Sequence, residues 1–303
     1  MRYLLIMNPS SRSGRGKRLW NAWEDALKQA GIDYESSFTE GPGHAMELAR
    51  TAGTDVVVAV GGDGTINEVL DGVIQSGNTS PAMGVLYSGT SPDFCRFHGI
   101  PIKPPEAIDA LLSGRKRKVD VGRISYRDDA GLEHVAHFGC SCNIGMGASV
   151  ARFANKWRRH LGDVLGTGAG VIYALARNAR ADISLNIDGK EHLLPEVNNL
   201  TIAKNPHIAS GLKFSLDLQP DDGKLAVIGI HSRSRAGIFR LLPSFYSGTV
   251  TAEKGIFLEE CGKVDISSLY PQEIEFDGDP RGFLPVRIEV LPRALTLIGG
   301  ANE

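Results

Sequence analysis

Short, mostly apolar runs alternate with longer amphipathic stretches in the first part of the chain. The strand-like runs lie at residues 3–7, 55–60 and 83–87, and runs of this kind are typical of strands buried on both faces of a parallel sheet. Stretches with helical spacing of apolar positions lie at residues 17–30, 44–51, 66–75 and 105–113. Because strands that alternate with helices form parallel sheets, residues 1–118 are predicted to form an α/β domain.

From about Val119 the pattern becomes rich in strands. Candidate strands lie at residues 120–126, 134–140, 183–187, 199–204, 225–231 and 287–291. The pairs Asp188-Gly189 and Asp222-Gly223 are hairpin turn signals between them. We therefore expect a second, mainly antiparallel β-rich domain over residues 119–292, with the last segment, 293–303, packing back on the first domain.

The length of the chain indicates two domains, and its cysteine usage indicates a reducing compartment. The chain has 303 residues and 42% hydrophobic content, and its net charge of −2 argues against bulk electrostatic binding to nucleic acid. The four cysteines form no CxxC pair and suit a reducing cytoplasm. Residues 1–7 hold no secretory apolar region, and the apolar stretch 164–176 is too short to cross a bilayer. We expect a cytoplasmic protein, soluble or peripheral at the inner membrane face.

The most informative segment is the valine-rich run 56–60 followed by Gly61-Gly62-Asp63-Gly64-Thr65. It predicts a buried strand, a tight loop and the start of a helix. Glycines let the backbone approach a bulky anion, and a helix N-terminus favours negative charge, so one interpretation is a phosphate-binding loop. The other is a glycine-rich turn without a ligand. The segment has neither the Walker spacing nor the G-x-G-x-x-G spacing of a dinucleotide site.

Two further loops follow strands in the same domain. The first runs from Asn8 through Gly14 to Lys17, and the other from Ser88 to Phe94. Both are rich in Gly and Ser and precede helices. Since ligands of open α/β sheets bind outside the carboxyl ends of the strands, the three loops together strengthen the prediction of a phosphate site.

These segments carry a resemblance to a known family, together with later ones in the same order. The later motifs are Ala203-Lys204-Asn205 with Gly211, Asp222-Gly223-Lys224-Leu225 and Asp277-Gly278-Asp279. With Thr39, Gly43-His44-Ala45 and the loop Gly89-Thr90-x-x-Asp93-Phe94, the chain resembles the diacylglycerol kinase and sphingosine kinase superfamily of lipid kinases in its short bacterial form. The Gly-Gly-Asp-Gly-Thr segment alone is shared with NAD kinases.

The resemblance implies ATP-dependent phosphoryl transfer to a lipid hydroxyl, with ATP in a cleft of the N-terminal domain and the lipid against the β-rich domain. It assigns ATP contacts to Asn8, Gly14, Thr39, Gly61, Gly62, Asp63, Gly64, Thr65, Ile66, Asn67, Glu68, Gly89 and Thr90. Asp63 is implied to lie near the catalytic metal and the phosphates. The cofactors implied are ATP and Mg²⁺.

The resemblance also implies a structural Mg²⁺ held by the side chain of Asp222 and by backbone carbonyls near Gln219 and Lys224. Such hard oxygen ligands suit Mg²⁺. Taken from the residues alone, Asp222-Gly223 is foremost a hairpin turn.

Two departures from the family pattern concern catalysis. The family's last motif reads Asp-Gly-Glu, whose Glu is the proposed general base, whereas this chain has Asp279, one methylene shorter. Pro92 stands where the family usually has Asn, and Cys140 where Asn is common. A catalytically impaired nucleotide- or lipid-binding homologue therefore stays open beside the lipid kinase, as does an NAD kinase. The sequence does not identify the acceptor lipid or the oligomeric state.

Two basic clusters, residues 115–118 and 156–160, are either solvated faces or contacts to anionic lipid headgroups. The region 152–180 mixes aromatic, aliphatic and basic residues. It suits an amphipathic flap over a lipid pocket or a helix packed on the β-rich domain.

Overall fold

The computed structural model describes residues 1–9, 16–77, 81–153, 169–170, 172–174, 176, 179–208 and 212–299. The chain divides into two compact units, Met1–Val121 with Pro292–Glu303 (unit 1) and Gly122–Leu291 (unit 2). The expected boundaries, after residues 118 and 292, lie within three residues of these. The predicted fold class, an α/β domain followed by an antiparallel β-rich domain, is confirmed.

Unit 1 is built on a parallel sheet. Its strand order is β2 (Tyr34–Phe38), β1 (Tyr3–Met7), β3 (Val56–Gly61), β4 (Ala82–Tyr87) and the end of β16 (Asp279–Ile298). Strand β3 is buried along its whole length, as its valine run predicts. Leu297 pairs with Met83, so the C-terminal segment adds a strand to this sheet.

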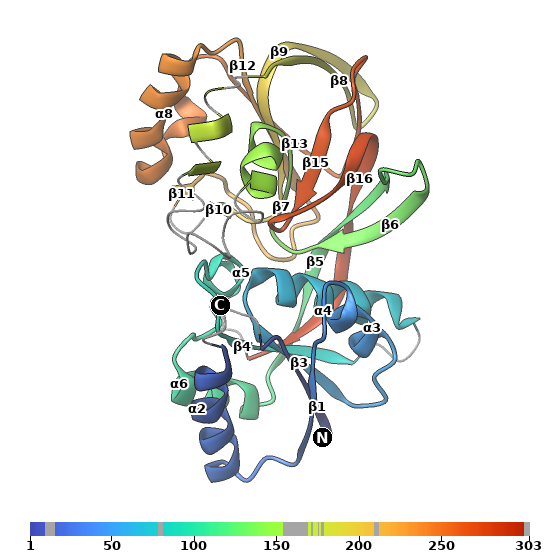
Figure 1. Ribbon diagram of the computed structural model, residues 1–303, viewed down its shortest axis with the longest axis vertical. Coiled ribbons are helices and arrows are strands. Elements are labelled where there is room, and N and C mark those ends of the chain that lie inside the picture. Colours follow the sequence, from blue (N-terminus) through green and yellow to red (C-terminus); the bar gives the residue numbers. More distant parts are fainter. Residues whose placement is uncertain are drawn as a thin grey trace. The chain divides into compact units, whose positions relative to one another are not determined.

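Helices cover both faces of this sheet (Figure 1). Helices α2 (Gly16–Gln29) and α6 (Pro104–Leu112) lie on one face, where Trp23 and Leu27 pack against Leu5 and Val58. Helices α3 (His44–Arg50) and α4 (Asp63–Gln75) lie on the other, and α5 is a short helix at Asp93–Phe97. Three layers of this kind leave the carboxyl ends of the strands as the edge where ligands bind.

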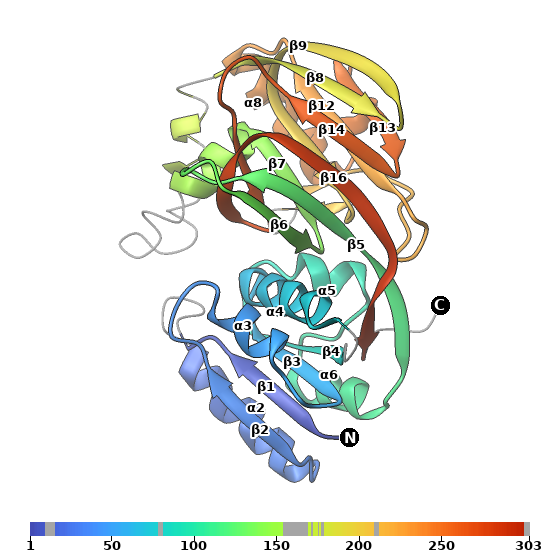
Figure 2. The same cartoon turned by 90° about the vertical axis from the view of Figure 1, so that its right-hand side faces the viewer.

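Unit 2 contains a ring of antiparallel strands that closes on itself. Strand β9 pairs with β7 and β8, β8 with β14, β14 with β16, β16 with β15, and β15 with β7 (Figure 2). The bounds are β7 Ser141–Gly145, β8 Ala181–Ile187, β9 Lys190–Ala203, β14 Lys263–Ser267 and β15 Glu273–Phe276. Buried and more exposed side chains alternate along β8, and its buried side chains contribute to one apolar core with those of the neighbouring strands.

The remaining elements extend this ring or lie beside it. Strand β12 (Leu225–His231) pairs with β9 and with β13 (Ile256–Cys261), and β5 (Lys116–Arg127) pairs with β16 and with β6 (Glu133–Phe138). The other elements are the short hairpin β10 (His207–Ile208) and β11 (Leu212–Lys213), helix α8 (Arg235–Ser247) and the 3₁₀ turn η2 (Val250–Ala252).

Three sequence-based expectations about local structure need correction. The strand expected at residues 120–126 begins earlier, because β5 starts at Lys116 and continues without a break to Arg127. Asp222-Gly223 forms no hairpin, since β11 and β12 on either side of it do not pair with each other. Strands β9 and β16 are 14 and 20 residues long, whereas only five or six residues of each had been recognised.

Helix α8 was missed, and its interior Pro243 explains why, since proline normally ends a helix. Its two ends nevertheless carry recognisable signals. The Ser234 hydroxyl accepts a hydrogen bond from the Gly237 N–H at 3.1 Å, and Gly248 ends the helix in the left-handed conformation with φ 78°.

Candidate functional site

Three loops predicted to bind phosphate come together at the carboxyl edge of the unit 1 sheet. The Asn8 amide donates to the Thr65 hydroxyl at 3.2 Å, which links the first loop to the second. The Ser88 N–H donates to the Gly61 carbonyl at 2.8 Å. A Cβ on Gly89 would lie 2.5 Å from the Cα of Gly62, so the second and third loops touch backbone to backbone.

Helix α4 begins inside the glycine loop, earlier than expected. Gly62 is its N-cap and makes no side-chain cap, so Asp63, Gly64 and Thr65 form the first turn. The N–H groups of a first helical turn point away from the helix body, and with the helix dipole they favour an anion. The structure thus places Gly61, Gly62, Asp63, Gly64 and Thr65 in an arrangement suited to phosphate.

The Asp63 carboxylate lies beside Tyr87, whose hydroxyl donates to Oδ2 at 3.4 Å. Burial raises the pKa of Tyr87 well above its ordinary value, and the negative charge of Asp63 raises it further. The phenol therefore keeps its proton and stays a donor to Asp63. This contact fixes the carboxylate at the edge of the phosphate loop.

Glu68 holds a neighbouring loop. Its carboxylate accepts the N–H groups of Gly43 at 2.8 Å and Ala45 at 3.1 Å, at the start of α3. These bonds tie the segment after Thr39 to α4. Glu68 therefore acts on the site through its neighbours.

The other predicted nucleotide residues of unit 1 differ in exposure. Thr39 is half-buried, and its N–H donates to the Met7 carbonyl at 2.8 Å, while Thr90 is exposed. The side chains of Ile66 and Asn67 are buried in α4, with 1% and 3% exposure. Gly14 lies outside the described residues.

The third loop accommodates the unusual Pro92. Pro92 is buried and serves as the N-cap of α5, and the Ser91 hydroxyl donates to the Asp93 carboxylate at 2.6 Å. Arg96 lies 3.5 Å from the other carboxylate oxygen. The hydrogen bond between Ser91 and Asp93 therefore holds the loop on either side of Pro92.

In unit 2, the Asp277-Gly278-Asp279 motif forms the tight turn between β15 and β16. Asp277 and Gly278 have φ values of 48° and 91°, the conformation of a two-residue hairpin turn with left-handed central residues. Asp279 is the first residue of β16, its side chain is 41% exposed, and Arg281 lies 3.5 Å from its carboxylate. The turn thus presents the predicted base at the surface of unit 2.

Two buried carboxyl groups support this turn. The Asp277 carboxylate accepts the N–H groups of Gly139, Cys140 and Ser141 at 2.8, 3.0 and 2.9 Å. The Glu275 carboxylate accepts the Asn143 amide at 2.5 Å and the Gly278 N–H at 2.8 Å. Burial raises the pKa of Asp277 to about 6 and that of Glu275 to about 8.

The sequence pattern does not reveal the role of Glu275 and its partners. The side-chain oxygen of Asn143 accepts a hydrogen bond from the Thr201 hydroxyl at 2.6 Å. The Thr201 hydroxyl in turn accepts one from the side-chain amide of Asn199 at 3.0 Å. The only signal in the sequence was an acidic residue two positions before Asp277. The Cys140 sulfur accepts a hydrogen bond from the Asn205 side-chain amide at 3.4 Å.

The three groups predicted to hold a structural Mg²⁺ converge on one point, and the ammonium of Lys204 lies there. It donates to the Asp222 carboxylate at 2.7 Å, the Gln219 carbonyl at 2.8 Å and the Lys224 carbonyl at 3.2 Å. These three oxygens suit a cation, but the Lys204 nitrogen already occupies the place between them where a metal ion would bind. The residues present therefore do not fit an added Mg²⁺. In the described part of the chain, no three His, Cys, Asp or Glu side chains group to hold a metal ion.

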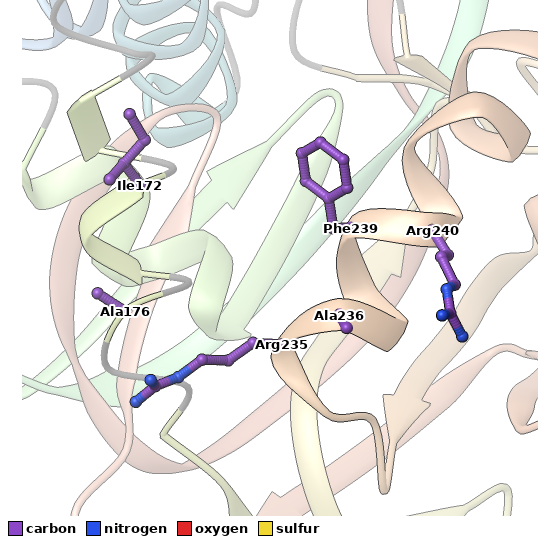
Figure 3. Close-up of a pocket in the computed structure, with 6 residues that line it drawn as sticks. All are labelled: Ile172, Ala176, Arg235, Ala236, Phe239 and Arg240. Atoms are coloured by element: carbon purple, nitrogen blue, oxygen red, sulfur yellow. The ribbon is translucent and has the colours of Figure 1, made fainter.

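A separate apolar pocket lies in unit 2 between α8 and the residues Ile172 and Ala176. Its volume is about 470 Å³, and Figure 3 shows its lining by Ile172, Ala176, Arg235, Ala236, Phe239 and Arg240. None of the helices in the described part of the chain is long and apolar enough to span a membrane. Of the two basic clusters, 156–160 lies outside the described residues, while Arg117 in the first donates to the His98 carbonyl.

Each of the two units matches the model of a known domain. Residues 2–124 match the diacylglycerol kinase catalytic domain, and residues 140–299 match the YegS C-terminal NAD kinase beta sandwich-like domain. A diacylglycerol kinase of Staphylococcus aureus is 27% identical over 295 residues, which are 95% of this chain and 89% of that protein.

Two solved structures share the fold. The crystal structure of a putative diacylglycerol kinase from Bacillus anthracis has a TM-score of 0.77 at 21% identity, covering 99% of this chain and 97% of that one. Yeast NADH kinase complexed with NADH has a TM-score of 0.56 at 13% identity, covering 100% of this chain and 84% of that one. The chain thus belongs to the diacylglycerol kinase catalytic domain family, in the form that carries a YegS-like C-terminal domain.

Proposed function

We propose that this protein is an ATP-dependent lipid kinase that transfers the γ-phosphoryl group of ATP to a hydroxyl of diacylglycerol, a sphingoid base or a related lipid. The observation that carries the proposal is the backbone contact of Gly62 with Gly89 beside the first turn of α4. Only glycines allow two loops to approach this closely, and the result is a cradle lined by main-chain groups. Family membership supports a lipid as the acceptor.

ATP binds to this cradle through its phosphates, and Asp63 orients the magnesium ion that ATP brings with it. A carboxylate in the first turn of α4 opposes a bare phosphate by charge repulsion. A bound Mg²⁺ would offset this repulsion, because Mg²⁺ prefers carboxylate and phosphate oxygens as ligands. Phosphoryl transfer depends mainly on such positioning and charge neutralisation.

Asp279 accepts the proton of the lipid hydroxyl. As the proton leaves, the hydroxyl oxygen forms a bond to the γ-phosphorus, and the bond from that phosphorus to the β–γ bridging oxygen breaks to give ADP. General base catalysis of this kind contributes roughly 10²- to 10⁴-fold. The turn held by Asp277 and Glu275 positions Asp279 for this step.

The protein meets its substrate at the membrane through the exposed face of α8. Phe239 and Tyr246 are 64% and 71% exposed on this helix, and Arg235 and Arg240 line the pocket beside Phe239 (Figure 3). Helix α8 carries no acidic residue. Aromatic side chains with arginines suit the interface of an anionic bilayer, where each basic residue contributes about 1 kcal/mol.

The deciding experiment incubates the purified chain with radiolabelled ATP, Mg²⁺ and extracted total lipids, and identifies the product by mass. A labelled lipid that disappears with Asp63→Ala and Asp279→Asn supports the proposal. NAD and single lipids are assayed in parallel. Phosphorylation of NAD without any lipid product assigns an NAD kinase, and saturable ATP binding without turnover of any acceptor assigns a binding protein that has lost catalysis.

A further inference from the structure

Lys204 is a buried cation whose ammonium donates hydrogen bonds to three oxygen acceptors of one loop. Its side chain is 1% exposed, and the three oxygens of Gln219, Asp222 and Lys224 lie within 3.2 Å of its nitrogen. An ammonium has three N–H donors. Lys204 therefore satisfies these acceptors and neutralises the Asp222 carboxylate.

The loop reinforces this arrangement with its own backbone. The Asp222 carboxylate also accepts the N–H groups of Gln219 at 2.7 Å and Lys224 at 3.0 Å. Burial by itself raises the pKa of Asp222, but the hydrogen bonds from Lys204 and these two N–H groups outweigh it and hold the pKa below its ordinary value. Asp222 is thus charged and closes the loop around the ammonium.

Lys204 also connects this loop to the turn that carries Asp279. The Lys204 N–H donates to the Cys140 carbonyl at 2.9 Å, and the Cys140 N–H donates to the Asp277 carboxylate at 3.0 Å. The loop 219–224 is therefore joined through Lys204 and Cys140 to the β15–β16 turn.

We propose that the Lys204 ammonium permanently replaces a divalent cation in the loop 219–224, so that unit 2 needs no metal ion there. Mg²⁺ requires close octahedral coordination by oxygens. Here an internal charge already balances the Asp222 carboxylate, and a second cation within the same oxygens would be repelled. This inference does not depend on the proposed kinase activity, because it concerns the folded state of unit 2.

Thermal unfolding in the absence of nucleotide tests the proposal with two matched variants. The wild-type Tm is expected to be the same, within about 1 °C, in EDTA and in millimolar Mg²⁺. Lys204→Ala removes the charge and leaves room for a hydrated ion, so its Tm in EDTA is expected to fall by on the order of 10 °C and to rise by several degrees with Mg²⁺. Lys204→Met removes the charge but fills the space. Its Tm is therefore expected to fall in EDTA and not to rise again when Mg²⁺ is added.

The control is Lys190→Met, which removes a 76% exposed lysine at the start of β9, the strand that ends just before Lys204, and is expected to change neither Tm nor its Mg²⁺ response. A Lys204→Ala Tm that equals the wild-type value, or that does not respond to Mg²⁺, overturns the proposal. If neither Lys204 variant folds, lysine acetylation of the wild type read by mass spectrometry decides. Equal protection of Lys204 in EDTA and Mg²⁺ supports the proposal, and protection that is lost in EDTA overturns it.

Discussion

Gly62 and Gly89 meet backbone to backbone at the carboxyl edge of the unit 1 sheet, and a Cβ on Gly89 would lie 2.5 Å from the Cα of Gly62. The contact joins the loops after β3 and β4, which are neighbours in the parallel sheet. Neither loop can move outward independently without losing it. The geometry of the cradle is therefore set by two residues that are 27 positions apart in the sequence.

Gly89→Ala is expected to separate these loops and weaken ATP binding by about 10-fold or more, since one decade corresponds to only about 1.4 kcal/mol. Isothermal titration with ATP and Mg²⁺ measures the change. Gly53→Ala is the matched control, because a Cβ there meets nothing within 4 Å. Equal affinities of wild type and Gly89→Ala would show that the cradle does not hold the nucleotide.

Asp279→Asn is expected to lower the rate of phosphate transfer by roughly 10²- to 10⁴-fold while leaving ATP affinity unchanged, because the amide cannot accept the proton. The half-exposed side chain makes a large loss of stability unexpected. Asp265→Asn, which removes another half-exposed carboxylate of unit 2, serves as the control. A variant that keeps the wild-type rate would exclude Asp279 as the base.

Asp279→Glu measures how closely the site is adapted to the shorter side chain. The additional methylene displaces the carboxylate by more than 1 Å, and a misplacement of about 1 Å can cost roughly 100-fold in rate. We expect a fall in kcat with little change in KM for ATP, measured by steady-state kinetics. An unchanged kcat would mean that the turn adjusts to either length.

Glu275 is expected to make the free energy of unfolding depend on pH. Its pKa is raised to about 8 in the folded chain from an ordinary value of 4.5, so the folded state keeps a proton that the unfolded state has lost. Stability from this group is present in full below about pH 4.5 and is lost as the pH rises through about 8.

Glu275→Gln removes this titration. Between pH 6.5 and 8.5, wild-type stability is expected to fall by on the order of 1 to 2 kcal/mol relative to the variant, and Asp277, whose pKa is about 6, titrates in both proteins and so cancels from the comparison. Urea unfolding at several pH values measures the difference. Parallel pH profiles for the two proteins would exclude a proton on Glu275.

Phe239→Asp is expected to reduce binding to phosphatidylglycerol vesicles by about 10-fold or more, because it replaces an exposed aromatic ring with a charge of the same sign as the lipid. Cosedimentation measures binding. Leu269→Asp is the control, since Leu269 is 93% exposed elsewhere in unit 2. Equal losses in both variants would argue against a specific contact through α8.

Segments with strong local patterns were predictable in both units. The run Val56–Val60 specified a buried strand, and the glycines after it specified a loop before a helix. The hairpin at Asp188-Gly189 was predictable for a similar reason, since its φ values of 47° and 90° suit Asp and Gly. Asp222-Gly223 has the same dipeptide but no paired strands, because Asp222 bonds to its own loop and to Lys204.

The sequence alone was enough to determine the alternation of strands and helices in unit 1, the glycine loops and the family, because these depend on residue type and short spacing. It could not show that Gly62 touches Gly89, that Glu275 supports the turn before Asp279, or that Lys204 lies among the oxygens of the Asp222 loop. Each of these contacts joins residues from different strands or loops. Only the pairing of the strands brings such groups within hydrogen-bond distance and removes water from around their charges, which decides what each group can do.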